Sequence, residues 1–449
     1  MAKKKAKGAA ASVDARQSTP TTAVEAAEAT KIERASRQKG SGSTSLGLPA
    51  TLGLAILALL TSSQLTETLL GGSLRQDSTP KGQDMAPFRQ TATTCAADYF
   101  LAEIPVNGMH ILCVEEGDDD IQDEDSQYLV TAFRDSRDGA VSSLQLPRNA
   151  SFQYLRAIIE DELDLMNVTV NPWAIFTPEG DRVVSLSTAL AAPALLIFEG
   201  GSFIWPGIRT GHKQQVSLDR GRTVTMETIS MKPLVFSIES FLTGEECDYI
   251  QKNASPHMAQ SGVSLMDKDR GRKATDWRTS STYFMPSKGH SPLQGIDARV
   301  AALTRAPKNH QELVQVLRYN TGQKYDAHHD YFDPILYSKD PGTLRMTQHG
   351  KVNRMATVLW YLSDVESGGE TIFPQHGGAP PPRDMSQCNA GLKVSPKKGK
   401  VIMFYSLTPD GRGDKSSLHG ACPVFGQAPK WAANKWVWTA PISDYIPTP

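Results

Sequence analysis

Residues Tyr319–Asp330 read YNTGQKYDAHHD, and His419 follows much later in the chain within SSLHGACPV. In a β-strand, residues i and i+2 point to the same face, so His328 and Asp330 can bind one ion while His329 points away. Two imidazoles and one carboxylate form the ligand set that holds non-haem Fe(II) on one face and leaves positions open for oxygen chemistry. The pattern therefore predicts an Fe(II) site made of His328, Asp330 and His419.

A His-x-Asp pair alone is common by chance, so the interpretation depends on the sequence around it. Six segments follow one another in a recognisable order: TVTMETISMKPLVFSIESFLTGEECDYI, DWRTSSTYFM, LVQVLRYNTGQKYDAHHDYFDP, RMATVLWYLSDVESGGETIFP, GLKVSPKKGKVIMFYSL and SLHGACPV. With these segments, the chain resembles the prolyl 4-hydroxylase family of 2-oxoglutarate oxygenases, most closely the plant-type enzymes. The resemblance covers roughly Val224 to Trp438.

The resemblance implies a catalytic domain over residues 224–441 of α+β class, a double-stranded β-helix (jelly roll) with flanking helices. The sequence agrees with this expectation in three places. Val314–Arg318, Thr357–Leu362 and Val401–Tyr405 are short apolar runs with the composition of strands, and Gly, Pro and Asp turns separate them.

The resemblance also implies roles for individual residues. The three residues of the Fe(II) site are the expected iron ligands, and Lys430 is expected to pair with the distal carboxylate of 2-oxoglutarate, with Tyr319 and Thr371 as hydroxyl donors. A buried dicarboxylate needs such a cation, because an unpaired charge taken out of water is costly. The implied cofactors are Fe(II), 2-oxoglutarate, O2 and L-ascorbate.

Lys430 departs from the family pattern in its spacing. The family usually places this lysine ten residues after the distal histidine, whereas Lys430 lies eleven after His419. Alternation along a strand that starts at Lys430 also turns Trp436 into the barrel, so we expect Trp436 at the cofactor site and Lys435 pointing outward. A bulge or longer loop at residues 426–429 would absorb the extra residue.

The expected peptide-binding side includes Tyr325 and Arg354, which match family positions that contact the peptide. Trp438 occupies a position where the plant-type pattern commonly has His. Two readings of Trp438 stay open: it stacks on a prolyl ring, or it packs at the rim of the barrel.

The implied reaction is hydroxylation of peptidyl proline at C4, coupled to decarboxylation of 2-oxoglutarate to succinate and CO2. The carboxylate of Asp330 favours hydroxylation, because related halogenases lack it and let chloride bind the metal. The alternatives are another peptidyl hydroxylase and an inactive peptide-binding scaffold. The expected partner is a proline-rich protein substrate, and a net charge of −1 gives no electrostatic case for nucleic acid.

The N-terminal part divides into a basic segment that we expect to be disordered (residues 1–45), an apolar segment (residues 46–63) and a linker (residues 64–97). The basic segment carries nine Lys or Arg against four acids. This charge predicts a signal anchor with a cytosolic amino terminus, and known plant-type relatives are type II membrane proteins of the endoplasmic reticulum and Golgi. The apolar core, Leu46–Leu60, is short for a spanning helix, so a buried helix or a targeting element stays an alternative.

Cysteines and glycosylation sequons are compatible with a lumenal enzyme. Five cysteines suit one or two disulfides and an odd thiol, although buried reduced thiols are an equal alternative. Sequons of the N-x-S/T type occur at Asn149, Asn167 and Asn253.

Residues 98–200 precede the catalytic domain, and residues 201–223 link the two. The pattern predicts strands at Met109–Val114, Tyr128–Phe133, Thr169–Phe176 and Ala194–Phe198, with a helix at Ala150–Leu165. A helix after a hairpin and a closing strand suggest a ubiquitin-like β-grasp fold. This unit is expected either to bind a protein partner or to act as a structural spacer, and residues 442–449 form a tail.

Overall fold

A computed structural model describes residues 97–116, 127–137, 142–165, 171–382 and 388–442. The predicted basic segment, the apolar segment and all but the last residue of the following linker lie outside the described residues. No helix among the described residues is long and apolar enough to cross a bilayer.

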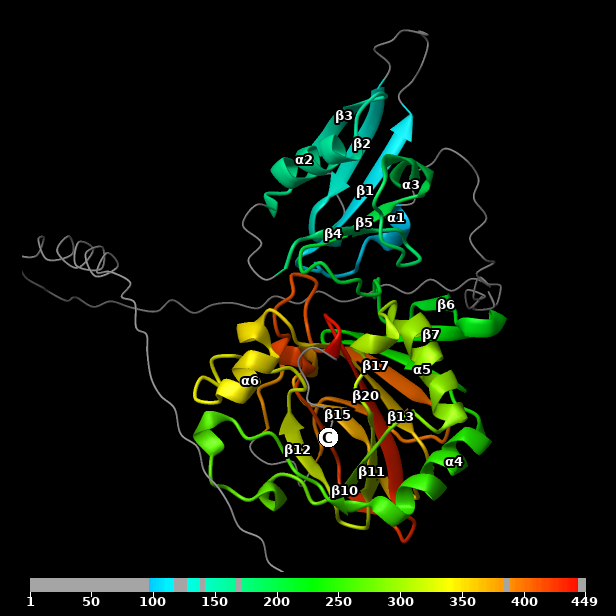
Figure 1. Cartoon of the computed structure of the whole chain (residues 1–449), viewed down its shortest axis with the longest axis vertical. Helices are drawn as coiled ribbons and strands as arrows, with labels where there is room; N and C mark the ends of the chain where they lie inside the picture. Colours follow the sequence, from blue (N-terminus) through cyan, green and yellow to red (C-terminus); the bar gives the residue numbers. More distant parts are fainter. Residues whose placement is uncertain (1–96, 117–126, 138–141, 166–170, 383–387, 443–449) are drawn as a thin grey trace, which may run out of the picture. The chain divides into compact units, whose positions relative to one another are not determined.

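The catalytic region is built on two antiparallel sheets that face each other, which gives the jelly-roll architecture expected from the sequence (Figure 1). The major sheet has nine strands among the described residues, in the order β6 (Lys213–Ser217), β7 (Thr223–Met231), β8 (Leu234–Ile238), β17 (Val401–Tyr405), β13 (Arg354–Tyr361), β20 (Lys430–Trp438), β11 (Val314–Tyr319), β10 (Ser281–Met285) and β9 (Ala259–Gln260). The minor sheet has the order β12 (Tyr325–His328), β18 (His419–Ala421), β15 (Thr371–Phe373) and β16 (Leu392–Val394), and β14 (Ser367–Gly368) pairs separately with β19 (Val424–Phe425).

Side-chain alternation along β13 and β17 separates two hydrophobic cores. Leu359 of β13 and Phe404 of β17 pack between the sheets, whereas Val358 and Met403 belong to a core on the opposite face of the major sheet. Because successive strand residues point to opposite faces, one register decides which side chains enter the barrel. The barrel interior is therefore fixed by these two central strands.

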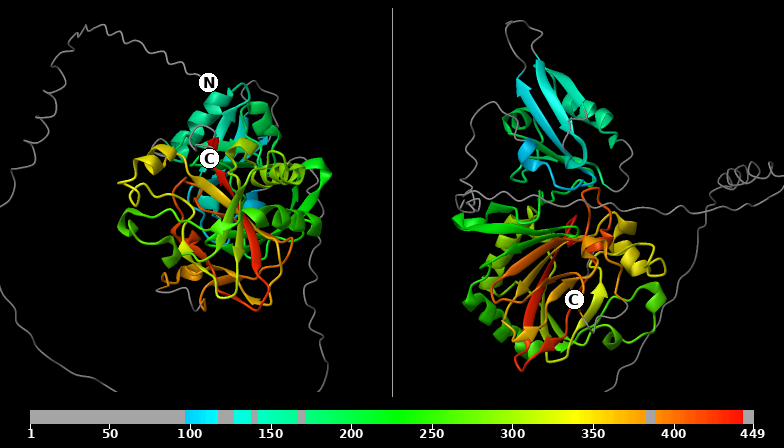
Figure 2. Two further views of the ribbon diagram at one scale, coloured as in Figure 1. Left: turned by 60° about the horizontal axis from the view of Figure 1, so that its bottom comes forward. Right: turned by 180° about the vertical axis from the view of Figure 1, so that it is seen from behind.

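Helices α4 (Gly244–Ala254) and α5 (Ser291–Thr304) lie along the outer side of the major sheet (Figures 1 and 2). α4 begins with a capping box in which Thr243 and Glu246 satisfy each other's backbone N–H groups. α5 buries Ile296 and Val300 in the outer core. A third helix, α6 (Pro341–Met346), follows β12 in the chain.

Within residues 98–200, the described parts form a small five-stranded antiparallel sheet, and the β-grasp interpretation is not supported. Its strand order is β3 (Ser142–Pro147), β2 (Gln127–Phe133), β1 (Met109–Glu116), β5 (Leu195–Phe198) and β4 (Ala174–Phe176), with helices α1 (Ala97–Phe100), α2 (Phe152–Glu162) and α3 (Leu186–Ala191). A β-grasp sheet joins its first and last strands in parallel, whereas β1 and β5 are antiparallel here. The strand β3 was also not expected from the sequence. We call residues 98–200 the small domain below.

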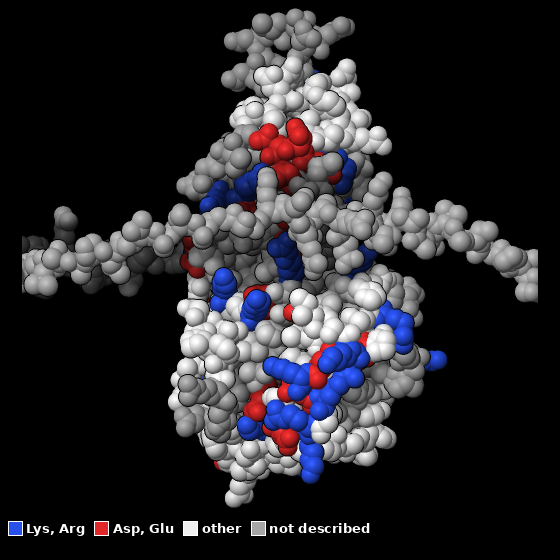
Figure 3. All heavy atoms as spheres, turned by 90° about the vertical axis from the view of Figure 1, so that its left-hand side faces the viewer, with Lys and Arg blue, Asp and Glu red and all other residues white. Residues whose placement is uncertain are grey.

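Basic and acidic side chains are interspersed on the face shown in Figure 3. The segment Asp267–Asp276 has this mixed character, because Arg270 lies 3.2 Å from Asp267 and Arg272 lies 3.5 Å from Asp269. Pairs of this kind, in which the arginine side chain is about half exposed, contribute little to stability.

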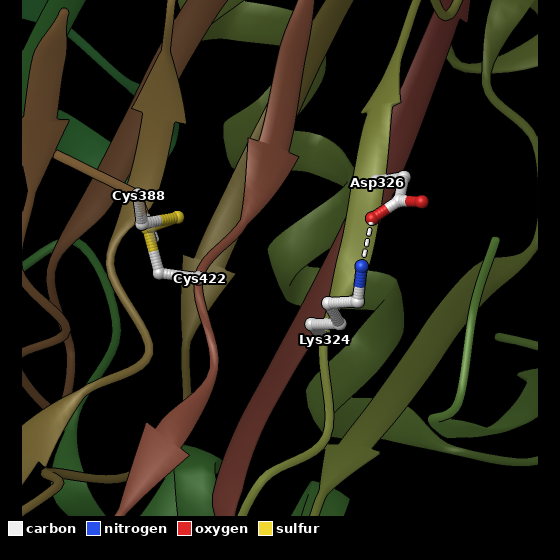
Figure 4. The surroundings of a disulfide bond; sticks show 4 residues. All are labelled: Lys324, Asp326, Cys388 and Cys422. Carbon is white, nitrogen blue, oxygen red and sulfur yellow. Dashed lines mark hydrogen bonds and ion pairs between the residues drawn. A yellow bond between two sulfur atoms is a disulfide. The ribbon is translucent and has the colours of Figure 1, made fainter. Parts of the chain in front are cut away.

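A disulfide joins Cys388 to Cys422, directly after β18 (Figure 4). The same view shows the ion pair of Lys324 and Asp326 at β12, with 2.5 Å between Nζ and Oδ1. Cys113 is also disulfide-bonded, and Cys247 is a buried free thiol. The disulfide therefore restrains the chain next to the strand that carries His419.

Candidate metal and cosubstrate site

The minor sheet brings the three expected iron ligands together. His328 ends β12, His419 begins β18, and the two residues are direct partners across the strands. Asp330 lies between them, with Oδ1 at 3.7 Å from His328 Nε2 and Oδ2 at 3.5 Å from His419 Nε2. One potential ligand atom of each residue lies within 4.8 Å of the others. These atoms are close enough to bind one metal ion.

The hydrogen-bond partners of the two histidine ligands leave their Nε2 atoms free for a metal. His328 Nδ1 is 2.9 Å from the Asp326 carbonyl oxygen, and His419 Nδ1 is 2.9 Å from the Ser417 carbonyl oxygen. Each Nδ1 therefore carries a proton and donates it, which leaves the Nε2 lone pair to bind the ion.

Protonation of the site also suits a metal. Burial and the neighbouring His419 lower the pKa of His328 well below its usual value, so this imidazole is neutral. Burial opposes ionisation of Asp330, but the positive charge of Arg354 and a 2.6 Å hydrogen bond from Thr357 favour the carboxylate, and the net effect lowers the pKa of Asp330. A neutral imidazole and an ionised carboxylate are the forms that ligate Fe(II). The donor set therefore fits the ion that the sequence predicts.

His329 points away from this cluster. Its Nε2 atom lies 3.0 Å from the carbonyl oxygen of Lys415, in the loop before His419. The structure thus gives His329 a role in tying two loops together.

A buried cation lies deeper in the barrel, where the distal end of 2-oxoglutarate is expected. Lys430 is 2% exposed and stands directly opposite Tyr319 across β20 and β11. Its Nζ atom is 5.3 Å from the centre of the Tyr319 ring. Burial lowers the pKa of Lys430 to about 7, although attraction to Glu370 opposes the shift. A carboxylate placed beside Lys430 would restore its charge.

Sequence reasoning missed Tyr361, which completes this end of the site. The Lys430 Nζ atom is 5.7 Å from the centre of the Tyr361 ring, and the Tyr361 hydroxyl is 2.8 Å from Thr371 Oγ1. Tyr361 lies four residues after Thr357 on β13, so both point into the barrel. Alternation along Thr357–Leu362 could have identified it. We call Tyr319, Tyr361, Thr371 and Lys430 the cosubstrate end.

The strand β20 also places the other expected residues. Trp436 lines a cavity next to the metal ligands, as alternation from Lys430 predicts. Lys435 points to the opposite face, but it is buried there, with Nζ 2.7 Å from Asp297 Oδ1 on α5. It does not reach solvent, because both faces of β20 are covered.

That cavity measures about 320 Å³ and opens beside His328 and Asp330. Tyr325 lines it and stacks on His328 with ring centres 3.7 Å apart. Arg354 lines it too, with its guanidinium carbon 3.6 Å from the centre of the Trp436 ring. We call this cavity the peptide end.

Trp438 does not line the cavity, so its position does not favour direct stacking on a prolyl ring. It is 1% exposed and packs on Phe332, and its Nε1 atom donates to Glu312 Oε1 at 2.6 Å. Glu312 in turn accepts two hydrogen bonds from Arg354, at 2.6 and 3.0 Å. Trp438 therefore acts on the cavity through Glu312 and Arg354, and the rim-packing reading describes its place.

A second residue missed by sequence reasoning is Arg278. It is 3% exposed, lines the cavity and lies over the Tyr325 ring. Its Nη2 atom and the Nε1 atom of Trp436 are buried without a hydrogen-bond partner among the described residues. A buried donor without an acceptor is costly, so both atoms are available to an acceptor on a ligand. No sequence pattern distinguishes Arg278 from other arginines of its segment.

Comparison with known proteins adds independent evidence. The family model described as 2OG-Fe(II) oxygenase superfamily matches residues 314–438. The chain is 40% identical over 217 residues to probable prolyl 4-hydroxylase 3 of Arabidopsis thaliana. The aligned region covers 47% of this chain and 71% of that protein. The chain is 41% identical over 240 residues to probable prolyl 4-hydroxylase 4 of the same plant, covering 50% of this chain and 73% of the relative.

A solved structure also resembles the chain, the collagen prolyl hydroxylase of Paramecium bursaria Chlorella virus-1 in complex with 2-oxoglutarate. The identity is 26% and the TM-score is 0.32, and the match covers 46% of this chain and 96% of the viral protein. The sequence relatives, the family model and the assembled ligand set agree. This chain belongs to the prolyl 4-hydroxylase family of Fe(II)- and 2-oxoglutarate-dependent oxygenases.

Proposed function

We propose that this protein hydroxylates peptidyl proline at C4 and converts 2-oxoglutarate to succinate and CO2 in the same turnover. The observation that carries the proposal is the convergence of His328, Asp330 and His419, beside a buried lysine and an open cavity. When bound, Fe(II) and 2-oxoglutarate supply the oxidising chemistry for breaking a C–H bond.

The chain's own residues bind and orient the cosubstrate. In this proposal, Lys430 neutralises the distal carboxylate, and the hydroxyl groups of Tyr319 and Thr371 donate hydrogen bonds to it. Tyr361 restrains Thr371 through its own hydroxyl. Because all four side chains are buried, the charge pair forms in a water-poor site, where it is stronger than at the surface.

The peptide end orients the substrate. Tyr325 and Trp436 line the cavity that would hold a prolyl ring, and the free donors of Arg278 and Trp436 suit peptide carbonyl oxygens. An extended proline-rich peptide presents such carbonyls, because its backbone makes no internal hydrogen bonds. Substrate positioning of this kind converts a chance encounter into a reactive geometry.

The test is succinate release by the purified protein with Fe(II), 2-oxoglutarate and ascorbate, with and without a poly-proline peptide. We expect peptide-dependent succinate and a peptide mass that gains one oxygen atom on proline, identified as 4-hydroxyproline. Succinate without a modified peptide would move the search to another peptidyl residue. No turnover despite metal binding would favour the peptide-binding scaffold.

We also propose that the catalytic region lies in the lumen of the endoplasmic reticulum or Golgi, behind an N-terminal anchor. The disulfide Cys388–Cys422 supports this placement, because disulfides persist mainly in oxidising compartments. A role for ascorbate, and a protein partner for the small domain, stay predictions.

The sequons provide a test of this placement. Asn149 is exposed, whereas the Asn253 side chain donates to the Tyr249 carbonyl oxygen within α4 at 2.7 Å. Expressed in a eukaryotic secretory host, the wild type should lose mass on glycosidase treatment, and Asn149→Gln should reduce that loss. A soluble, unglycosylated protein would contradict the lumenal placement.

A further inference from the structure

The loop that leads to the metal ligand His419 makes a tight hairpin outside the barrel. This loop spans residues 406–418, between β17 and β18. At its tip, the Thr408 N–H donates to the Arg412 carbonyl oxygen at 2.8 Å, and the Arg412 N–H donates to Asp410 Oδ1 at 3.1 Å. We call residues 406–418 the ligand hairpin.

The small domain holds the tip of the ligand hairpin. The Gly200 N–H donates to the Pro409 carbonyl oxygen at 2.7 Å. A Cβ atom at Gly200 would lie 2.5 Å from the nitrogen of Gly411, and one at Gly108 would lie 2.6 Å from the nitrogen of Asp410. Contacts this close are possible only for glycine, so the two backbones are packed directly against each other.

The base of the ligand hairpin is held from the same direction. The Trp205 N–H, in the segment after the small domain, donates to the Tyr405 hydroxyl at 3.0 Å. Leu407 packs in one hydrophobic core with Phe198 and Trp205. The small domain and the following segment therefore contact the hairpin at both its tip and its base.

Short hydrogen bonds connect the hairpin to the metal ligand. Asp414 Oδ1 accepts from the Ser416 N–H at 2.8 Å, and the Ser417 hydroxyl donates to the Asp414 carbonyl oxygen at 2.7 Å. The Ser417 carbonyl oxygen in turn accepts a hydrogen bond from the N–H group at His419 Nδ1. Outer partners of this kind set the orientation and basicity of a metal-bound histidine.

We infer that the small domain is a positioning element for the iron site: it holds the ligand hairpin, and through Ser417 it fixes His419 in the orientation that binds metal. This inference rests on the proposed metal site and goes beyond it, because it assigns a role to residues that precede the catalytic domain. It distinguishes the small domain from a tethered spacer, whose loss would leave metal affinity unchanged.

The experiment is isothermal titration of the metal-free full chain with Mn²⁺, which avoids oxidation of Fe(II), on the wild type and on Gly200→Ala. We expect the variant to bind Mn²⁺ about 10-fold more weakly, the low end of the cost of losing an outer partner of a ligand, because Gly200 acts on His419 through the ligand hairpin. Its KM for Fe(II) should rise in parallel, while its kcat at saturating Fe(II) stays near that of the wild type.

Two control variants separate positioning from general damage. Gly295→Ala adds the same methyl group where no atom outside its own stretch of α5 lies within 4 Å; it should leave metal affinity unchanged and, inside a helix, should raise the melting temperature slightly. Ile159→Val removes a methyl group from the separate core under α2, which should lower the melting temperature but leave Mn²⁺ affinity unchanged.

Each result decides for or against the inference. Wild-type Mn²⁺ affinity in Gly200→Ala would overturn it, and so would an equal loss of affinity in Ile159→Val. If Gly200→Ala does not fold, Tyr405→Phe replaces it, because this change removes only the hydroxyl acceptor at the hairpin base and should weaken Mn²⁺ binding by a smaller factor. A wild type that binds no Mn²⁺ would contradict the proposed metal site instead.

Discussion

The two ends of the site are built in different ways. At the cosubstrate end, Lys430, Tyr319, Tyr361 and Thr371 all project from strands, and each is at most 2% exposed. The peptide end opens to solvent and takes residues from loops as well as from strands. A cosubstrate of fixed shape suits a rigid, dry pocket on strands, whereas loops can be changed to suit a substrate without disturbing the barrel.

The border of the peptide end shows the contrast most clearly. Phe284 and Leu336 line the cavity and are 42% and 39% exposed, and Ile335 beside them is 80% exposed. Two loops meet at this border, where Asp267 Oδ2 accepts from the Lys339 N–H at 2.7 Å and from the Ser338 hydroxyl at 3.0 Å. Substitutions at the metal and the cosubstrate end should therefore cost more than substitutions at the peptide end.

The largest effect is expected where the metal itself is lost. His419→Ala should abolish turnover and weaken Mn²⁺ binding by more than the ~100-fold that loss of an outer partner costs, because it removes a ligand directly. Isothermal titration and succinate release measure the two effects. The neighbouring imidazole supplies the control, since His329→Ala should retain metal binding. Turnover by His419→Ala would remove the metal assignment.

The next effect concerns the buried cation at the cosubstrate end. Lys430→Met should raise the KM for 2-oxoglutarate about 100-fold, because leaving a buried charge without its partner costs about 3 kcal/mol. Initial rates of succinate release at varied 2-oxoglutarate measure the change.

Lys435 provides a matched control, because it is a second buried lysine on the same strand. Lys435→Met should lower the melting temperature, since it leaves Asp297 unpaired, but it should not change the KM for 2-oxoglutarate. Equal KM values for Lys430→Met and the wild type would show that another group binds the distal carboxylate.

The pH dependence of cosubstrate binding follows from the same lysine. The pKa of Lys430 is about 7 in the empty site, so the amine is mostly protonated at pH 6 and mostly neutral at pH 8. Because the carboxylate binds the charged form, 2-oxoglutarate binding takes up a proton above pH 7, and affinity should fall about tenfold per pH unit there.

Titration of the Mn²⁺-loaded protein with 2-oxoglutarate, in buffers of different ionisation enthalpy, measures this proton uptake directly by calorimetry. In Lys430→Arg the side chain stays charged, so the pH dependence should disappear even if the affinity is lower. Affinity that does not change with pH in the wild type, without proton uptake, would contradict the lowered pKa.

The sequence predicts those strands whose residues carry a local hydrophobic pattern. The run Val401–Tyr405 has the same bounds as β17, and Val314–Arg318 ends one residue before β11 does. Their β-branched and aromatic runs identify buried strands without further information. The start of β13 is not predicted because Arg354 is charged, and its pairing with Glu312 helps to keep it half-buried there.

The remaining features depend on contacts between distant segments. The small domain was given a β-grasp fold because the pattern locates strands but not their direction, and the pairing of β1 with β5 joins segments far apart in the chain. For the same reason, no periodic sequence pattern predicts the cavity position of Arg278 or the hydrogen bond from Gly200 to Pro409. The metal ligands could be identified because His328 and Asp330 are only two residues apart in the sequence, although Asp330 lies beyond the end of β12.

The smallest effect is expected at Trp438, and it decides how the peptide end is supported. Trp438→Phe keeps the ring packing on Phe332 but removes the hydrogen bond to Glu312, a loss of about 1 kcal/mol, or about fivefold in an equilibrium constant. Because Trp438 acts through Glu312 and Arg354, the KM should rise by a similar factor for every proline peptide, and the KM for 2-oxoglutarate should not change. Steady-state rates with several peptides, together with a double-mutant cycle with Glu312→Gln, measure this coupling. A change in the order of preference among peptides, without coupling to Glu312, would instead place the Trp438 ring against the substrate and bring this residue into the loop-dependent part of the site.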